Sequence, residues 1–337
     1  PWPSRFWSDT VALATPPTLS TLRKALPASP SILTTWLEPA RGPLQPPLDA
    51  PALPADGQMQ HGAALAASHQ AHTVLRVLGA PIVMRLRRNA QVLREAVHLL
   101  EGQRVPGANA TPAAQWLADN IALVEEQLEE ATEALPARYF RRLPVLTGGA
   151  ANASPRVHDI AWAWLPRVHH AFDAQLLDAF FDGYQDQVEP TWGEWWALPS
   201  VLRMVLIEQL RRVGERVVAD RAARSLANWV ASETGAADLA PVSAALGALQ
   251  RRGAERTFLL QLHLRWSELA VDDARRVWLA EHLADPAATR HAQQSAEAAH
   301  DADVSQARRS LRAVAQFDWG VWIGQRSRLA QVLRQLP

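Results

Sequence analysis

Aromatic and charged residues gather between positions 189 and 212, in the stretch EPTWGEWWALPSVLRMVLIEQLRR. Tryptophan rings stack on sugar rings, and carboxylate, amide or guanidinium groups form hydrogen bonds with sugar hydroxyls. The residues that could form such a carbohydrate site are Trp192, Glu194, Trp195, Trp196 and Arg203, with Gln185 nearby. We favour the alternative that WGEWWALP is a buried hinge between helices, because the chain carries 14 tryptophans throughout its length. The sequence leaves open whether Glu194 and Arg203 face each other or face a ligand.

The other candidate residues do not have the spacing or the sequence context of a metal or catalytic site. The Asp-x-Asp pair, Asp301 and Asp303, lies in a polar, alanine-rich segment with no strand before it, so we interpret Asp303 as an N-terminal helix charge. The segment QLHLRW has one residue more than the Gln-x-x-Arg-Trp motif of membrane glucan synthases, which turns Gln261 by about 100° on a helix. We expect a core helix there instead. The histidines at 61, 69, 72, 169 and 170 lack the spacing of a specific metal site. We therefore predict no catalytic residue, no metal and no cofactor in this segment.

The elements that position these residues are predicted to be helices. Apolar residues recur at spacings of three and four from Met59 onward, over about 61–78, 81–102, 111–135, 155–171, 173–187, 197–231, 237–252 and 254–268. Alternation with a period of two is essentially absent, so no sheet is predicted. In the helix from 197, Leu202, Leu206, Leu210, Val213 and Val217 form a core stripe, and Glu208 is placed to pair with Arg211 or Arg212.

The N-terminal segment differs in composition from the rest of the chain. Prolines crowd the first 54 residues, and each one removes a main-chain donor and fixes φ. We therefore predict a Pro-rich extended segment with short helices over 1–57. An all-α, irregular multi-helix bundle follows over 58–337, with a sub-boundary near 147–154.

Composition excludes several classes of protein. Acidic and basic residues balance at 34 each, which argues against a nucleic-acid partner. There is no cysteine for disulfide or thiolate chemistry, and no apolar run is long enough to span a membrane. The chain begins PWPSRFW without methionine, which we interpret as part of a longer protein.

Several blocks, in the same order, resemble the N-terminal part of cyclic β-1,2-glucan synthases, which are large bacterial membrane glycosyltransferases. The blocks are PAAQWLADNIALVEEQ (112–127), LPARYFRRLP (135–144), PRVHDIAW (155–162), GYQDQVEPTWGEWWALPSVLRMVLIEQLRR (183–212) and SLRAVAQFDW (310–319). The resemblance implies a cytosolic region that precedes the first membrane span, on the cytoplasmic side of the bacterial inner membrane. It also implies that the residues that act on UDP-glucose belong to a later part of the family's chain.

The function predicted from these observations is a helical region of such a glycosyltransferase, non-catalytic by itself and serving docking or regulation. Its partners would be the remainder of the membrane glycosyltransferase chain and the growing glucan, with Tyr184 or Tyr139 as candidate attachment points for a primer. The alternatives are a free-standing all-α module that binds carbohydrate or protein, and an independent acid/base glycosidase that uses a carboxylate such as Glu194.

Overall fold

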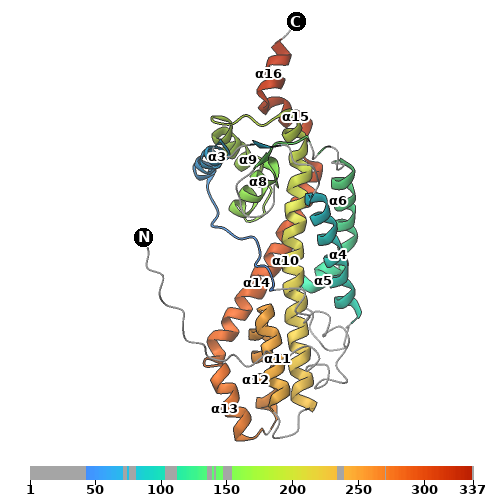
Figure 1. The fold of residues 1–337 in the computed structure, drawn as a ribbon, viewed down its shortest axis with the longest axis vertical. Helices are drawn as coiled ribbons and strands as arrows, with labels where there is room; N and C mark the ends of the chain where they lie inside the picture. The colour runs from blue at the N-terminus through green and yellow to red at the C-terminus, as the bar shows by residue number, and fades with distance from the viewer. Residues whose placement is uncertain are drawn as a thin grey trace. The chain divides into compact units, whose positions relative to one another are not determined.

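The computed structural model describes residues 43–70, 74–75, 81–102, 112–134, 139, 142–146, 154–233, 239–269 and 271–335. Helices form nearly all of this part of the chain (Figure 1), which confirms the all-α class. The α-helices are α3 (Ala55–Gln70), α4 (Pro81–Gly102), α5 (Pro112–Asp119), α6 (Ile121–Ala134), α8 (Arg156–Trp164), α9 (Ala174–Gln185), α10 (Trp192–Glu233), α11 (Ala240–Arg252), α12 (Glu255–Glu268), α13 (Asp273–His282), α14 (Pro286–Gln316), α15 (Trp319–Arg326) and α16 (Arg328–Gln335). A 3₁₀ turn, η2 (Leu165–Val168), follows α8.

The described residues also contain a very small antiparallel sheet. Its strands, of two residues each, pair in the order β1 (Val74–Leu75), β2 (Val145–Leu146), β3 (Ser154–Pro155). Val145 pairs with Leu75 on one side and with Pro155 on the other. Strands this short carry no detectable period, which is why the sequence did not predict them. The sub-boundary predicted near 147–154 lies between β2 and β3, and its residues 147–153 are outside the described part. The short helices expected before position 43 also lie outside it.

Several predicted helices have different ends in the structure. The helix expected over 61–78 is wrong at both ends: α3 begins at Ala55 and ends at Gln70, and Val74 and Leu75 pair with β2 as a strand. The helix expected over 111–135 is divided at Asn120, whose Nδ2 donates to the Trp116 carbonyl at 3.0 Å. Asparagine side chains compete in this way with the regular main-chain pattern. The helix expected over 155–171 ends early, because His169 and His170 both adopt left-handed φ values of 48° and 58°.

The predicted hinge at WGEWWALP is wrong. α10 begins at Trp192 rather than near residue 197, so this stretch forms the first turns of the helix, and Pro199 lies inside it. Proline removes one main-chain hydrogen bond there. The helix nevertheless begins upstream because Thr191 and Glu194 cap its N-terminus.

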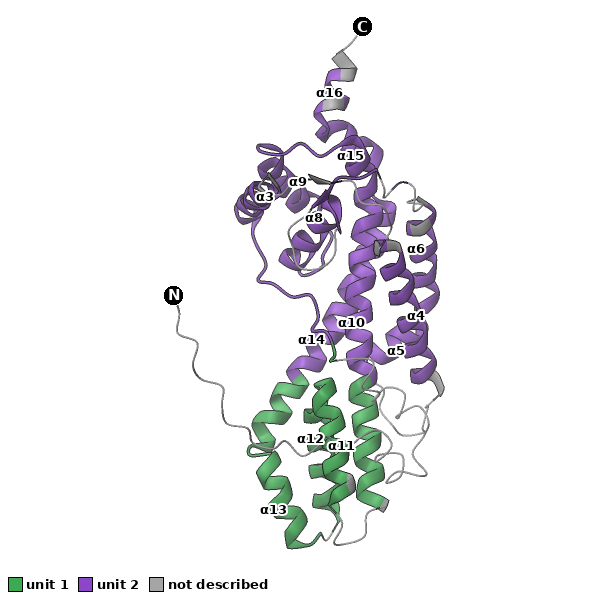
Figure 2. Ribbon diagram, in the orientation of Figure 1, with its two compact units in different colours: residues 1–44, 219–294 green, residues 45–218, 295–337 purple. Residues whose placement is uncertain are grey.

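The described chain divides into two compact units, coloured in Figure 2, with unit 1 comprising 1–44 and 219–294 and unit 2 comprising 45–218 and 295–337. Both α10 and α14 contribute residues to each unit. Unit 1 packs the last part of α10 against α11, α12 and α13, around Phe258, Leu262 and Trp266. A hydrogen bond of 2.7 Å from Thr257 to Asp220 joins α12 to α10 inside this unit.

Unit 2 is organised around the first part of α10. The predicted stripe of Leu202, Leu206, Leu210, Val213 and Val217 is buried, which confirms that it faces the core. α4 and α6 lie beside α10 in Figure 1, and ion pairs join each of them to it.

α3 and α9 cross closely in unit 2. A Cβ added at Gly62 would lie 2.0 Å from the Phe180 carbonyl oxygen, and one added at Gly183 would lie 1.9 Å from the Met59 carbonyl oxygen. Glycine is required at both positions because main chain touches main chain.

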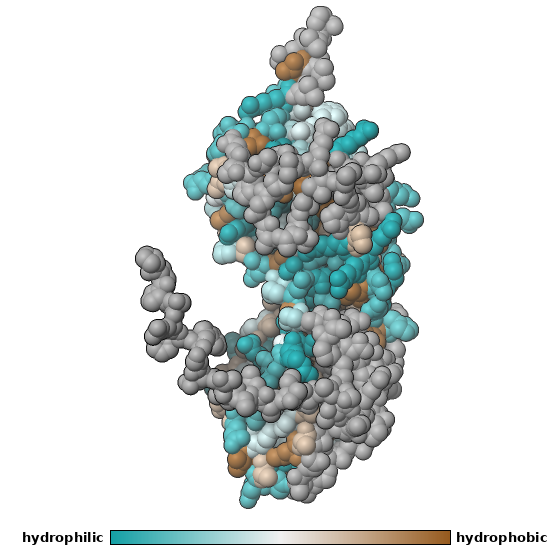
Figure 3. Space-filling view, in the orientation of Figure 1, coloured by the Kyte–Doolittle hydropathy of each residue, from teal (hydrophilic) through white to brown (hydrophobic). Residues whose placement is uncertain are grey.

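Among the coloured residues on the face in Figure 3, hydrophilic ones predominate and hydrophobic ones form small, separate brown spots. No described helix has both the length and the apolar character that a membrane crossing requires.

Candidate functional site

The first turn of α10 is fixed by a capping box. The Thr191 main-chain N–H and its hydroxyl donate to Glu194 Oε2 at 2.8 and 2.9 Å, and the Glu194 main-chain N–H donates back to Thr191 Oγ1 at 3.3 Å. This reciprocal arrangement satisfies main-chain donors that a helix N-terminus otherwise leaves unpaired. The Thr-x-x-Glu spacing is visible in the sequence, and it was the signal that could have located the start of α10.

Glu194 is also held by an arginine from α8. Arg156 Nε donates to Oε1 at 2.8 Å and its Nη2 donates to Oε2 at 2.5 Å, and the Glu194 side chain is only 1% exposed. Burial alone would lower the pKa of Arg156, but its hydrogen bond and ion pair with Glu194 raise that pKa above the ordinary value. Arg203 lies apart and pairs with Glu130 of α6 at 3.4 Å. Glu194 and Arg203 therefore have separate partners and do not face each other.

The three neighbouring tryptophans have different environments. Trp195 is 1% exposed and packs against Phe181 and Trp322, with ring centroids 4.7 and 5.5 Å away. Trp192 and Trp196 are 43% and 45% exposed, and their ring centroids are 6.0 Å apart. The structure thus divides the five predicted site residues: Glu194 and Trp195 are buried, Arg203 is largely buried, and Trp192 and Trp196 remain accessible.

Gln185 and the two tyrosines, which the sequence also suggested, make internal contacts. Gln185 Nε2 donates to Glu189 at 3.0 Å, and the Tyr139 hydroxyl donates to the Gly193 carbonyl at 2.8 Å. Tyr184 is fully buried, with its hydroxyl 2.7 Å from His69 Nδ1, and burial raises its pKa above the ordinary phenol value. A fully buried hydroxyl is inaccessible to a glucan primer in this fold.

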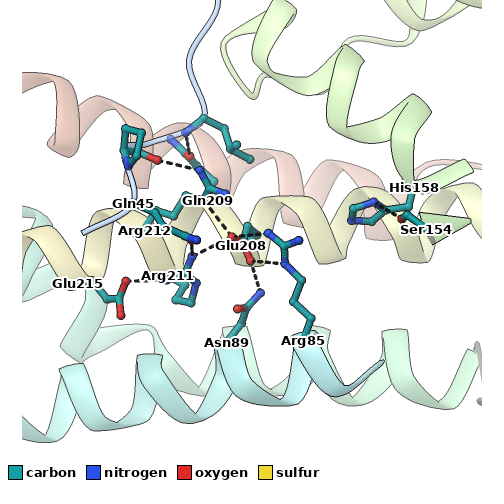
Figure 4. A network of polar contacts seen from close by, with 12 residues as sticks. Gln45, Arg85, Asn89, Ser154, His158, Glu208, Gln209, Arg211, Arg212 and Glu215 are labelled. Carbon is teal, nitrogen blue, oxygen red and sulfur yellow. Dashed lines mark hydrogen bonds and ion pairs between the residues drawn. The ribbon is translucent and has the colours of Figure 1, made fainter. Parts of the chain in front are cut away.

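A second polar cluster surrounds Glu208 on α10, and Figure 4 shows it from close by. Arg85 and Asn89 of α4 donate to this carboxylate at 3.0 and 2.7 Å. Arg211 and Arg212 donate to it at 2.8 and 2.9 Å, which confirms the predicted pairing. Burial would raise the pKa of Glu208, but the hydrogen bonds and charges of Arg85 and Arg211 hold it far below its usual range. Its arginine partners therefore keep this carboxylate ionised.

An extended segment, residues 45–53, lies along this cluster, and we call it the strap. Arg212 Nη1 donates to the Pro46 carbonyl at 2.9 Å, and Arg211 donates to Gln45. The Leu48 main-chain N–H donates to Gln209 Oε1 at 2.7 Å. Polar side chains of α10 therefore satisfy the main chain of a proline-rich segment that has no helix or sheet of its own.

Gln209 links the strap to α14. Its Nε2 donates to Asp303 Oδ2 at 3.1 Å. Burial, together with the negative charge of Asp49 on the strap, raises the pKa of Asp303 to about 6. The interpretation of Asp303 as an N-terminal helix charge is wrong, because it lies in the middle of α14. Its neighbour Asp301 instead accepts a hydrogen bond of 2.7 Å from the first turn of α5, at Ala113 N.

His61 and His69 contact different groups. His61 contacts the Ala163 carbonyl at 3.2 Å, whereas His69 lies between Tyr184 and Asp159, 2.9 Å from the Asp159 carboxylate. Burial lowers the pKa of both His158 and His170 to about 4. Within the described ranges, no group of three or more His, Asp or Glu side chains could hold a metal ion. His72 lies outside those ranges.

No protein-family model matches the chain. The cyclic beta-(1,2)-glucan synthase NdvB of Rhizobium meliloti (strain 1021) is 34% identical to it over 241 residues, or 68% of the chain. The chain is related to a segment of the cyclic β-1,2-glucan synthase family. It spans 8% of the length of this relative.

The two sequence patterns that resemble glucan synthase motifs have structural explanations in this chain. Asp301 accepts a hydrogen bond from α5, whereas Asp303 accepts one from α10. In α12, Leu262 and Trp266 are buried and Gln261 bonds to Asn228 at 2.8 Å, which confirms the predicted core helix.

Sequence reasoning missed Arg156, Arg85 and the strap. Their partners lie 38 to 166 residues away along the chain, so no local spacing reveals them.

Proposed function

We propose that this chain is a helical, non-catalytic segment of a cyclic β-1,2-glucan synthase polypeptide. It would dock onto, or regulate, the part that transfers glucose from UDP-glucose to β-glucan, on the cytoplasmic side of the bacterial inner membrane. The observation that carries the proposal is the 34% identity to NdvB over 68% of this chain.

The environments of the buried carboxylates support a non-catalytic role. An acid/base catalyst needs a group that exchanges protons near the working pH and can reach the substrate. Glu208 is held ionised by arginines, and Glu194 is enclosed by Arg156 and Thr191. The alternative of a glycosidase that uses Glu194 loses support for this reason.

Asp303 has a raised pKa of about 6, which would suit a general acid. Its Oδ2 is occupied by Gln209, which also holds the strap. We therefore assign it to the attachment of the strap, and an isosteric Asp303→Asn variant tests this assignment.

Two measurements test the proposal. The isolated 337-residue chain, given radiolabelled UDP-glucose, should incorporate no label into glucan. A synthase polypeptide that lacks the corresponding segment should lose glucan synthesis, and the chain added in trans should restore it. Synthesis by the isolated chain that disappears in Asp303→Asn would overturn the non-catalytic assignment. An undiminished rate after deletion of the segment would overturn the docking role.

A further inference from the structure

One face of α10 carries two exposed tryptophans. Trp192 and Trp196 are exposed, whereas Trp164 and Trp195 are fully buried and Trp266, Trp278, Trp319 and Trp322 are also buried in the described fold. Single exposed apolar residues are ordinary on protein surfaces. Here two indoles stand one helical turn apart with an interplanar angle of 69°, so they form a continuous aromatic edge.

Beyond the two rings, the same side of the helix carries partly buried residues. Trp192, Trp196, Pro199 and Arg203 follow one another at spacings of four, three and four, which places them on the same side of the helix. We call this set the α10 stripe. It extends roughly 16 Å along the axis, since each helical residue rises about 1.5 Å. A short oligosaccharide could lie along this length.

The scaffold of the stripe is rigid. The capping box and Arg156 fix Glu194, which lies between Trp192 and Trp196 in the sequence, and the Tyr139 hydroxyl holds the Gly193 carbonyl at 2.8 Å. Aromatic groups presented by a fixed backbone lose little conformational entropy when a ligand stacks on them. The stripe is therefore preorganised for stacking.

The far end of the stripe is polar but carries no net charge. The Arg203 side chain is 12% exposed and pairs at 3.4 Å with Glu130, whose side chain is about half exposed. Arg203 Nε is buried and has no acceptor among the described residues, so this atom is not itself available to a ligand. A paired guanidinium and carboxylate offer both donors and acceptors, which suits the hydroxyls of a neutral sugar better than an ionised ligand.

We propose that the α10 stripe binds a β-1,2-linked gluco-oligosaccharide. Sugar rings stack on Trp192 and Trp196, and hydroxyl groups bond to Arg203 and Glu130. The aromatic edge and the neutral polar end favour a neutral saccharide, whereas the choice of the β-1,2 linkage rests on the proposed function.

The test is calorimetric titration of the whole 337-residue chain with β-1,2-gluco-oligosaccharides and with β-1,3-linked ones of equal length. Saturable binding that prefers the β-1,2 linkage is expected. Trp192→Ala and Trp196→Ala should each weaken it by about tenfold, because the loss of an aromatic contact costs on the order of 1.4 kcal/mol. Arg203→Met should weaken it as well. Met84→Ala is the matched control, since Met84 is an exposed apolar residue on α4, outside the stripe, and should leave the affinity unchanged.

Trp192, Trp196 and Met84 are exposed, whereas Arg203 is largely buried, so unchanged circular dichroism must verify that each variant folds. Absence of saturable binding at millimolar oligosaccharide, or unchanged affinity in both tryptophan variants, overturns the inference. Tryptophan-dependent binding to anionic lipid vesicles without sugar binding also overturns it. If the chain binds the sugar but fails to restore synthesis in trans, the docking role is wrong and the sugar-binding site is supported.

Discussion

Arg156 and Glu194 form a two-point ion pair between the start of α8 and the first turn of α10, with donor–acceptor distances of 2.8 and 2.5 Å. The same carboxylate accepts the main-chain N–H of Thr191. One side chain therefore begins a helix and joins it to another helix, which makes the orientation of the α10 stripe depend on Arg156.

Removal of either partner of this pair should be strongly destabilising. Arg156→Met and Glu194→Gln should each lower the free energy of unfolding by about 3–5 kcal/mol, because each leaves a buried polar group without its partner. The double variant should lose clearly less free energy of unfolding than the sum of the losses in the two single variants. Urea unfolding followed by circular dichroism measures all three, and additivity within about 0.5 kcal/mol would contradict direct coupling.

The cluster around Glu208 should make stability depend on pH in acid. Its folded pKa lies below the unfolded one, so its contribution is complete above the unfolded pKa of about 4.3 and is lost as the pH falls below that value. At pH 7, Glu208→Gln should cost about 2–4 kcal/mol. Unfolding measured from pH 7 to 3 should show this difference shrinking below pH 4–5, and a constant difference would refute the assignment.

Asp303 should have the opposite effect. Burial and Asp49 raise its folded pKa to about 6, so the ionised form destabilises the fold above that pH, and the penalty disappears as the pH falls toward the unfolded pKa of about 3.9. Asp303→Asn should stabilise the chain at pH 8 by about 1–2 kcal/mol, a value reduced for partial exposure to solvent. Thermal unfolding should show no gain near pH 4.

A control for this effect is Asp49→Asn. It removes the charge that disfavours ionisation of Asp303, so it should recover part of the same gain and should not add fully to Asp303→Asn. Two fully additive gains would mean that Asp49 and Asp303 act independently.

The crossing of α3 and α9 should tolerate no side chain. Gly62→Ala and Gly183→Ala should each cost about 1–3 kcal/mol or more, because the new Cβ would overlap a main-chain carbonyl of the other helix. Gly247→Ala, in α11, is the matched control: nothing lies within 4 Å of its added Cβ, so a gain of about 0.5–1 kcal/mol is expected. Equal effects at all three positions in chemical denaturation would argue against the close crossing.

The helical class and the bounds of several helices could be predicted because they depend on local patterns. α4 runs over Pro81–Gly102 as predicted, since proline suits a first turn and glycine suits a helix end. The core stripe of α10 and the pairing of Glu208 with Arg211 and Arg212 follow equally from spacings of three and four.

The candidate site was predicted only in part, because its organisation depends on distant contacts. The sequence singled out Trp192 and Trp195 alike, but burial against Phe181 and Trp322 separates Trp195 from its exposed neighbour. The start of α10 was missed because Pro199 was given more weight than the Thr191–Glu194 cap.

The burial of Tyr184 has an optical consequence. The chain has two tyrosines, and burial raises the pKa of both Tyr184 and Tyr139. Tyr184 is additionally held by His69, which in turn contacts the half-exposed Asp159 carboxylate. In an alkaline titration, full tyrosinate absorbance therefore requires the interior between α3, α8 and α9 to open. The ultraviolet spectrum of the unlabelled chain in base thus serves as an intrinsic reporter of unfolding in this region.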